Sequence, residues 1–250
     1  MSWTLYDRMI DSLPNNILID EVVSGPSWTM VRAGTRVGCA MTTPVDTMTP
    51  LHPSDFVGVS LQQAAACVRS WNLLEASIGM AAINAYYNHP SQEEQIVRTA
   101  PNLLNRSGED AFSAHLEEIK GKKVAVIGHF PHLDSFAEVA TLSILERNPR
   151  SGDYPDTACE YLLPEQDFVF ITGSTLVNKT LPRLLSLAKQ AYTVVVGPST
   201  PLCTALLECG VDELNTLIVE DGDACRDIIK TGGTGGALAK TGYRVGLQAG

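Results

Sequence analysis

Short runs of β-branched and apolar residues alternate with helical patterns along the chain from Lys122 onward. The five apolar runs are KVAVIG (123–128), TLSILER (141–147), DFVFITG (167–173), YTVVVGP (192–198) and TLIVE (216–220). Segments with apolar residues at helical spacing, such as LPRLLSLAKQA and ACRDIIK, lie between or after them. Because strands that alternate with helices pair side by side in one direction, the pattern predicts a doubly wound parallel sheet of the Rossmann-like α/β class.

The N-terminal part has a different pattern. TLYDRMIDSL predicts a helix, and three short β-rich runs follow it: ILIDEVVSG, SWTMVRAG and RVGCAMTT. Glycine, proline and threonine separate these runs, which predicts an antiparallel meander. LQQAAACVRSW and NLLEASIGMAAINAYYN carry alanine, leucine and methionine at helical spacing, so they predict helices that cover one face of the meander. We therefore expect a small α+β domain here.

Two polar stretches, NHPSQEEQ and NRSGED, separate the two patterns and precede a short amphipathic helix, AFSAHLEEIKG. We expect an α+β domain at 1–90, a linker with a short helix at 91–120 and the Rossmann-like domain at 121–250. In open parallel sheets, ligands bind outside the carboxyl ends of the strands, where the strand order reverses. The loops after the first, third and fourth predicted strands are therefore the places to search for a site.

Charge and cysteine spacing narrow the range of partners. The 250 residues carry a formal charge of -10, and the 18 lysines and arginines are scattered, so no nucleic-acid partner is expected. No secretory leader opens the chain and no apolar run approaches the ~18 residues that cross a bilayer, so we expect a cytoplasmic protein without membrane contact. The six cysteines form no C-x-x-C pair, which predicts buried thiols instead of a zinc ribbon or a disulfide framework.

The loop after the first strand departs from the dinucleotide-binding pattern. It reads Gly128, His129, Phe130, Pro131. A pyrophosphate turn needs further glycines, and Pro131 lacks the amide that such a turn offers to its ligand. His129, His132 and Asp134 have the ligand types of a divalent-metal site, since imidazole and carboxylate both bind such ions. The alternative is that His129 only makes loop hydrogen bonds and His132 is exposed.

The loops after the third and fourth strands are rich in hydroxyl groups. The third loop offers Thr172, Gly173, Ser174, Thr175, Asn178 and Lys179, and the fourth offers Gly197, Pro198, Ser199 and Thr200. Helices are predicted to begin near Leu181, capped by Thr180, and near Pro201, capped by Ser199 or Thr200. Hydroxyls, an amide and an ammonium suit a polar or anionic ligand. The same residues also suit ordinary capping turns with a solvated lysine.

Three further features bear on the location of a functional site. Glu146 follows Gly128 by 18 residues, near the ~20-residue offset of a ribose-binding acid in nucleotide-binding folds. The glycine-rich tail TGGTGGALAKTG follows a helix, so it predicts a helix stop and a mobile end. Asn72, Glu75 and Asn84 interrupt an apolar helix, and we expect either that one of them points into an interdomain cleft or that they form a solvated stripe.

The motifs KVAVIGHFP, EYLLPEQDFVFITGSTLVNKTL and VVVGPSTPL resemble those of the heavy-metal chelation family, and the likeness covers nearly the whole chain. The resemblance implies an N-terminal domain similar to that of enolase, a C-terminal Rossmann-like domain and a site between them. The barrel of enolase needs ~200 or more residues, so enolase activity is not expected. The family's motif positions fall on Gly128, His129, Phe130, Pro131, Glu160, Thr172, Gly173, Ser174, Thr175, Asn178, Lys179, Gly197, Pro198, Ser199 and Thr200. We assign these residues to ligand binding, with His129 as a metal ligand.

Three functions are consistent with these features. The first is binding of a divalent or heavy metal ion, or of a metal-chelating small molecule, in the cleft between the domains, with or without an enzymatic step. The second is a nucleotide- or S-adenosylmethionine-dependent enzyme, which the sheet and Glu146 favour and the missing glycines oppose. The third is a structural or regulatory module, because no Ser-His-Asp or Cys-His arrangement is present. A homodimer is expected from the general frequency of such assemblies.

Overall fold

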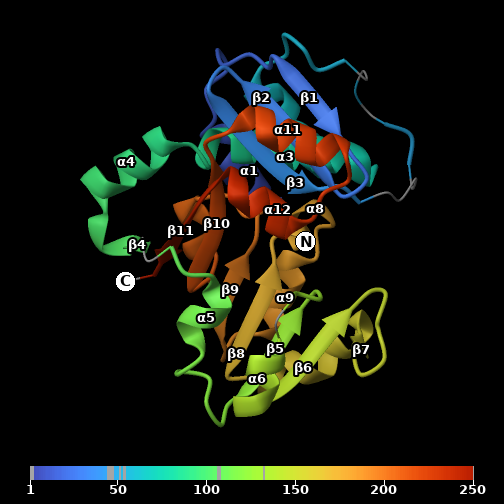
Figure 1. Cartoon of the computed structure of the whole chain (residues 1–250), viewed down its shortest axis with the longest axis vertical. Helices are drawn as coiled ribbons and strands as arrows, with labels where there is room; N and C mark the ends of the chain where they lie inside the picture. The colour runs from blue at the N-terminus through green and yellow to red at the C-terminus, as the bar shows by residue number, and fades with distance from the viewer. Residues whose placement is uncertain are drawn as a thin grey trace.

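The molecule contains two β-sheets. The computed structural model describes residues 3–43, 48–50, 52, 55–105, 108–131 and 133–249. A three-stranded antiparallel sheet comes from the N-terminal part, and an eight-stranded, mostly parallel sheet comes from the rest of the chain. Figure 1 shows the small sheet above the carboxyl ends of the central strands of the large sheet. The predicted fold class, a small α+β unit before a Rossmann-like sheet, is confirmed.

The small sheet is the predicted meander. The N-terminal elements are α1 (Thr4–Asp11), β1 (Glu21–Ser24), β2 (Trp28–Ala33), β3 (Arg36–Met41), α2 (Leu61–Ala65), the 3-10 helix η1 (Ala66–Arg69) and α3 (Leu73–Tyr87). The strands pair in the order β1-β2-β3. A two-residue turn at Gly34 and Thr35 joins β2 to β3, and Gly34 has a φ of 61°, a conformation that glycine adopts without steric cost.

Most residues of helix α3 are buried, which explains its mostly small and apolar composition. It packs against β2 and β3 on one side and against α2, η1 and α8 (Ser174–Val177) elsewhere. The approach is very close: a Cβ on Gly38 of β3 would lie 2.0 Å from the Ala85 backbone nitrogen. A Cβ on Gly79 of α3 would lie 2.2 Å from the Val68 backbone nitrogen of η1. Glycine at these two positions therefore sets how tightly the N-terminal layers pack.

The large sheet has the order β4-β11-β10-β9-β8-β5-β6-β7. Its strands are β4 (Leu104–Asn105), β5 (Lys123–Ile127), β6 (Thr141–Glu146), β7 (Tyr154–Pro155), β8 (Phe168–Thr172), β9 (Tyr192–Val196), β10 (Glu213–Val219) and β11 (Gly242–Gln248). The five predicted strands are β5, β6, β8, β9 and β10, and all pair in parallel. The sequence reasoning missed β4, β7 and β11. The expectation of a mobile glycine-rich end was wrong, because that segment leads into β11, which pairs along the length of β10.

The helices that follow the first domain are short. They are α4 (Pro90–Thr99), α5 (Ala111–His115), α6 (Asp134–Val139), α7 (Cys159–Leu162), α8, α9 (Leu181–Leu187), α10 (Thr204–Leu207), α11 (Gly222–Lys230) and α12 (Gly235–Leu238). Further 3-10 turns are η2 (Pro101–Leu103), η3 (Asp156–Ala158), η4 (Leu163–Glu165) and η5 (Ala239–Thr241). Phe112, Phe136 and Phe170 pack their rings together on one face of the large sheet. Among the described residues, no helix is long and apolar enough to cross a membrane.

The two parts of the chain share their packing. Helix α11 does not cover the sheet that precedes it. It lies on β1 and β2 of the small sheet, opposite α3, as Figure 1 shows. The resulting core includes Trp28 and Met30 from β2 and Leu217 and Ile229 from the C-terminal part. The expected linker at 91–120 holds α4, β4 and α5, and β4 pairs with β11. The division at 90 and 121 stays a prediction, and the packing crosses it at several points.

Candidate metal centre and the strand-end loops

The strand order places the predicted loops next to one another. β5 pairs with β6 on one side and with β8 on the other, so the sheet reverses its direction of growth at β5. The loops that begin at Gly128 and Gly173 therefore flank the switch point, and the loop at Gly197 follows the next strand, β9. The backbone at Gly128 has a φ of 99°, and a Cβ there would lie 3.1 Å from the Thr172 methyl group. Local packing thus requires glycine at Gly128, and the binding roles assigned to these loops stay predictions.

The loop after β5 is closed by its own hydrogen bonds. The His129 backbone N–H donates to Glu146 Oε1 at 3.1 Å, and the Arg147 N–H donates to Glu146 Oε2 at 2.7 Å. Glu146, the candidate ribose ligand, therefore already accepts hydrogen bonds from two backbone N–H groups. His129 Nδ1 lies 3.2 Å from Asp153 Oδ2. Among the described residues, His129 belongs to no group of three potential metal ligands, and His132 lies outside them.

The loop after β8 uses most of its polar groups locally. Thr172 Oγ1 lies 3.1 Å from Ser174 Oγ, and the Thr175 hydroxyl donates to the Thr172 carbonyl at 2.7 Å. Helix α9 begins at Leu181 with Thr180 at its N-cap position, as predicted. The Thr180 hydroxyl does not cap the helix. It donates to Asn178 Oδ1 at 2.6 Å. These hydrogen bonds stay within the loop and do not cap α8 or α9, while the Lys179 side chain extends into the N-terminal part.

The loop after β9 is bound to the N-terminal part by α3 and β3. Asn84 Nδ2 donates to the Pro198 carbonyl at 3.2 Å, and Asn88 Nδ2 donates to the Thr200 carbonyl at 2.9 Å. Ser199 Oγ accepts the Met41 backbone N–H at 2.8 Å. Ser199 and Thr200 therefore connect the two parts of the chain. The predicted helix start near Pro201 was wrong, because α10 begins only at Thr204.

Glu160, assigned to ligand binding by the family motif, lies on α7 in an ion pair with Arg183 of α9. Arg183 Nε donates to Glu160 Oε1 at 2.9 Å, and about half of each side chain is exposed to solvent. The hydrogen bond between the two side chains lowers the pKa of Glu160 and raises the pKa of Arg183. An exposed ion pair of this kind contributes little to stability. The assignment of Glu160 to a ligand site stays a prediction.

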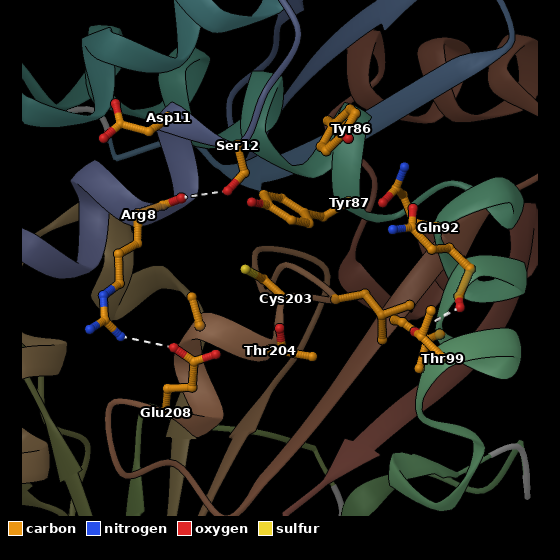
Figure 2. Close-up of a pocket in the computed structure, with 14 residues that line it drawn as sticks. Arg8, Asp11, Ser12, Tyr86, Tyr87, Gln92, Thr99, Cys203, Thr204 and Glu208 are labelled. Carbon is orange, nitrogen blue, oxygen red and sulfur yellow. Dashed lines mark hydrogen bonds and ion pairs between the residues drawn. The ribbon is translucent and has the colours of Figure 1, made fainter.

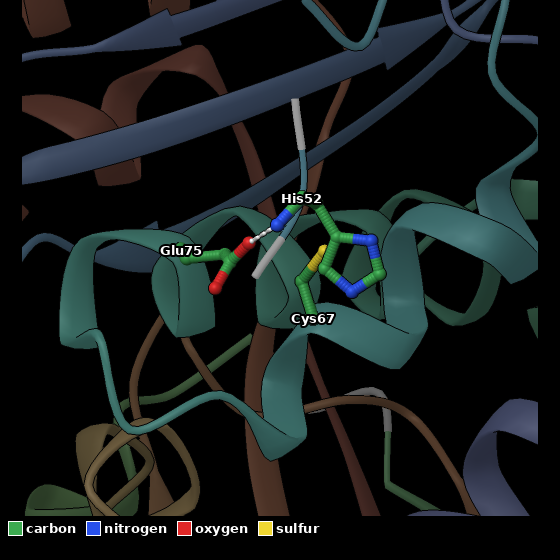
Figure 3. A group of neighbouring side chains, drawn as sticks. All are labelled: His52, Cys67 and Glu75. Atoms are coloured by element: carbon green, nitrogen blue, oxygen red, sulfur yellow. Dashed lines mark hydrogen bonds between the residues drawn. The ribbon is translucent and has the colours of Figure 1, made fainter. Parts of the chain in front are cut away.

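A group of three potential metal ligands lies in the N-terminal part, close to the point where Lys179 enters. The ligand atoms of His52, Cys67 and Glu75 all lie within 4.8 Å of one another, and this is the only such group found among the described residues. Figure 3 shows the Cys67 sulfur and the Glu75 carboxylate on either side of the His52 backbone. The His52 N–H donates to Glu75 Oε1 at 2.7 Å. Cys67 and Glu75 are buried, and His52 is exposed.

Local structure explains why these side chains meet. Glu75 lies in the first turn of α3, and the N-cap residue Asn72 accepts the Glu75 N–H at 3.1 Å. Cys67 lies in η1, which crosses α3 closely enough to require Gly79. His52 comes from the loop between β3 and α2, and Asn72 Nδ2 donates to the Met48 carbonyl of that loop at 2.6 Å. The N-cap of α3 thus holds both the carboxylate and the segment that carries the imidazole.

The electrostatics of the group depend on Lys179. Its Nζ atom donates to the Ser70 carbonyl and lies 5.3 Å from the centre of the Trp71 ring. Burial lowers the pKa of Lys179 to about 8, against the opposing attraction of the Glu75 charge. Burial also raises the pKa of the Cys67 thiol to about 12, and the Glu75 charge adds to this effect. The Lys179 ammonium therefore lies within electrostatic range of the Glu75 carboxylate, and the Cys67 thiol is protonated near neutral pH.

Two cavities lie away from the metal-ligand group and from the loop residues predicted to bind ligand. One, of about 680 Å³, is lined by residues of α1, α3, α4 and α10 and includes the Arg8–Glu208 ion pair and the two tyrosines Tyr86 and Tyr87 (Figure 2). The other, of about 730 Å³, lies beside α9 and the loop before β10. Neither cavity is lined by His52, Cys67, Glu75 or a residue predicted to bind ligand.

Comparison with known proteins identifies the family. A family profile named DUF364, with the description "Putative heavy-metal chelation", matches residues 110–247, which is more than half of the chain. This chain belongs to the DUF364 family. A second profile with the same description, DUF4213, matches residues 6–87. The predicted family resemblance is therefore confirmed for both parts of the chain.

Solved DUF364 structures share the fold. A protein of unknown function from Desulfitobacterium hafniense is 41% identical, with a TM-score of 0.89 over 99% of this chain and 98% of that chain. A DUF364 protein from Pyrococcus horikoshii is 24% identical, with a TM-score of 0.80 over 98% of both chains, and it shows the fold alone. An uncharacterized protein of Methanocaldococcus jannaschii is 32% identical over 155 residues. The match spans 57% of this chain and about half, 54%, of that relative's length.

The donor set of His52, Cys67 and Glu75 fits the metal that the DUF364 description implies. Thiolate sulfur favours soft and borderline ions, imidazole favours zinc, copper, nickel and iron, and carboxylate completes a mixed set that zinc also accepts. Sequence reasoning missed His52 and Cys67, because the cysteines were predicted to be buried apolar thiols and no pattern singled out His52. Spacings of 15 and 8 residues form no short ligand motif. The polar residue Glu75 in an apolar helix was the one signal that pointed here.

Proposed function

We propose that this protein binds a heavy or borderline divalent metal ion through His52, Cys67 and Glu75. The convergence of these three ligand atoms within 4.8 Å is the observation that carries the proposal. The description of the two matching families supports the same class of ligand. Two of the three ligands are buried, so they are held by the packing of η1 and α3 and need little ordering when the ion arrives.

Three protein ligands leave a position of a tetrahedral ion open. In zinc proteins an open position takes water or a small molecule, whereas purely structural sites are closed by four protein ligands. We therefore propose that the ion is held together with a small-molecule chelator instead of being enclosed by the chain. The ligand class is the expected one, a metal ion or a metal-chelating small molecule, but the three ligands all come from the N-terminal part and not from both sides of the expected interdomain cleft. The Lys179 ammonium, which interacts electrostatically with Glu75, supplies a positive charge for an anionic group of such a chelator.

The predicted strand-end site is kept as a second, separate proposal. His129 and Asp153 provide an imidazole and a carboxylate 3.2 Å apart, and Gly128 lies at the switch point of the sheet. The nucleotide alternative receives no support. Glu146 is already bonded to the amides of its own loop, and the amides of a glycine-rich turn are missing.

The test is metal binding by protein that has been dialysed against a chelator and then titrated with Zn²⁺, Cd²⁺ or Co²⁺. We expect one ion per chain, and with Co²⁺ a thiolate-to-metal absorption band. Cys67→Ser and Glu75→Gln should each weaken binding by ~100-fold or more, since loss of a direct ligand costs at least as much as loss of its supporting contacts. Cys159→Ser is the matched control, because Cys159 is also a buried free thiol but lies on α7.

Two results would contradict the proposal. Equal affinity in Cys67→Ser and Cys159→Ser would exclude the thiol as a ligand. Retention of metal in Cys67→Ser and Glu75→Gln with loss in His129→Ala would move the site to the loop after β5. Native mass spectrometry on each variant gives the stoichiometry and any co-bound organic mass, so it also tests whether a chelator accompanies the ion.

A further inference from the structure

Two cysteines from opposite parts of the sequence meet in the core between the small sheet and α11. Cys39 lies on β3 and Cys225 lies on α11, and their sulfur atoms are 3.3 Å apart. Their exposed fractions are 2% and 0%. Trp28, Met30 and Ile229 belong to the apolar cluster that surrounds them. The pair is therefore buried, and the surrounding packing holds the two sulfurs against each other.

The metal-ligand group and this thiol pair use opposite faces of the small sheet. Adjacent residues of a strand point to opposite faces. Gly38 faces α3, since a Cβ there would collide with the backbone of α3, and the next residue, Cys39, faces α11. Cys67, the thiol of the proposed metal centre, lies in η1 on the α3 side. The two sites therefore have separate surroundings and can be tested independently.

We propose that Cys39 and Cys225 form a redox modification site that a hydroperoxide converts into a disulfide between β3 and α11. A disulfide needs a sulfur–sulfur distance of about 2.05 Å, so the two sulfurs must approach by roughly 1.3 Å. Small rotations of the two side chains about their Cα–Cβ bonds can supply an approach of this size. The packing of α11 on the small sheet already provides the rest of the geometry.

The environment assigns a role to each sulfur. The hydrogen bond from the Cys39 thiol lowers the pKa of Cys225, and the positive charge of Arg32 acts in the same direction against burial. Arg32 is held beside the first turn of α11, where its Nη2 atom donates to Asp223 at 2.8 Å. The same hydrogen bond and burial raise the pKa of Cys39. These opposite pKa shifts favour Cys225 as the attacking sulfur and Cys39 as the resolving one.

The reaction has two balanced steps. The Cys225 thiolate attacks one oxygen of hydrogen peroxide, the O–O bond breaks, and a sulfenic acid forms with release of one water after proton uptake by the leaving hydroxide. The Cys39 thiol then attacks the Cys225 sulfur, the S–O bond breaks, and a second water leaves with the Cys39 proton. Together the two sulfurs lose two electrons, which the peroxide gains. The product links two residues that are 186 positions apart in the chain.

The disulfide would fasten the C-terminal helix to the N-terminal sheet. Cys39 is also next to the contacts that join the two parts, because its carbonyl accepts Asn84 Nδ2 at 2.7 Å and Met41 two residues later bonds to Ser199. A covalent link at this point restricts any separation of the two parts. It also removes conformational freedom from the unfolded chain, so the oxidised protein should melt at a higher temperature.

The test uses full-length, reduced protein that has been freed of metal with a chelator and then treated with hydrogen peroxide. After denaturation and alkylation, we expect two fewer alkylated thiols, a Cys39–Cys225 linked peptide by mass spectrometry and a higher Tm that a reductant reverses. Proteolytic cleavage within residues 91–120 should then leave two fragments that separate on a denaturing gel only after reduction. Cys67→Ser should form the same link, which separates this site from the proposed metal centre.

Variants that lack one of the two cysteines test which sulfur reacts in each step. In Cys39→Ala, a sulfenic acid should accumulate on Cys225 and be trapped by dimedone, whereas Cys225→Ala should give neither a sulfenic acid at 39 nor the link. Wild-type peptide mapping decides the question even if a variant fails to fold. The proposal is overturned if both thiols stay alkylatable at a peroxide dose that oxidises the partly exposed Cys209, or if the linked peptide joins other cysteines.

Discussion

Lys179 shows how a single side chain can leave its own loop and act elsewhere. The sequence places it among hydroxyl-bearing loop residues, where either a ligand cradle or a solvated lysine is the natural interpretation. In the structure it has a φ of 64°, which is uncommon for a residue with a Cβ, and only 6% of it is exposed. Its ammonium reaches Ser70 and Trp71 of the N-terminal part. No sequence pattern encodes such a contact, because it depends on how two distant segments pack.

Replacing Lys179 by methionine should change how stability depends on pH. The folded pKa of about 8 lies below the ordinary value of 10.5, so between these pH values the unfolded chain binds the proton more tightly. The free energy of unfolding of the wild type should therefore rise with pH across this window, by as much as about 3 kcal/mol at 1.36 kcal/mol per pH unit. The increase should be missing in Lys179→Met. Urea unfolding of metal-free protein at pH 7.5 and 10 measures the difference, and parallel profiles for the two proteins would contradict it.

Helix α3 is the element that most of the N-terminal chemistry depends on. It carries Glu75 in its first turn and Asn84 and Asn88 at its end, so one helix contacts both the proposed metal centre and the loop after β9. Its polar residues looked like a solvated stripe or a cleft-facing group from the sequence. In the structure these polar side chains are buried. Their burial is tolerated because neighbouring segments supply hydrogen-bond partners.

Because β3 lies so close to α3, alanine substitutions at two glycines of the same hairpin should differ strongly in their cost to the free energy of unfolding. Gly38→Ala would place a methyl carbon 2.0 Å from the Ala85 nitrogen, so β3 and α3 must separate, at a cost of ~3 kcal/mol or more. Gly34→Ala meets no atom within 4 Å and costs only the strain of its positive φ, about 1 kcal/mol. Denaturant unfolding of both variants gives the two values. Similar losses in both would show that α3 does not pack this tightly on β3.

At the scale of the whole molecule, the sequence predicted the fold class and most elements but not the interlocking of the two parts. The alternation after Lys122 was enough for five parallel strands, since each of them reads as an apolar run and β5, β8, β9 and β10 are buried on both faces. β7 and β4 were missed because they have only two residues each, and β11 because glycines precede it. The metal-ligand group was missed for a different reason. Its members come from a loop, a 3-10 turn and a helix that only tertiary packing brings together.

The shared packing predicts that the two parts unfold together. Helix α11 forms a core with the small sheet. Asn88 joins the end of α3 to the segment after β9, through bonds to the Thr200 carbonyl and the Leu202 N–H, and to β10, through a bond to the Thr216 hydroxyl. Three broken hydrogen bonds in a buried site should cost about 2–4 kcal/mol in Asn88→Ala. If the parts are coupled, this loss should lower the stability of the β8 and β9 strands as much as that of the small sheet.

Two probes can separate the parts in the same unfolding experiment. All three tryptophans, Trp3, Trp28 and Trp71, lie in the N-terminal part, so their fluorescence reports on that part and on the contacts that Trp28 and Trp71 make with the rest of the chain. Hydrogen exchange of peptides from β8 and β9 reports on the large sheet. We expect coincident transitions for both probes in the wild type and an equal shift of both in Asn88→Ala, with Asn15→Ala at an exposed position as the unshifted control. Two separate transitions, or a shift confined to fluorescence, would mean that the contacts across α3 and α11 do not couple the parts.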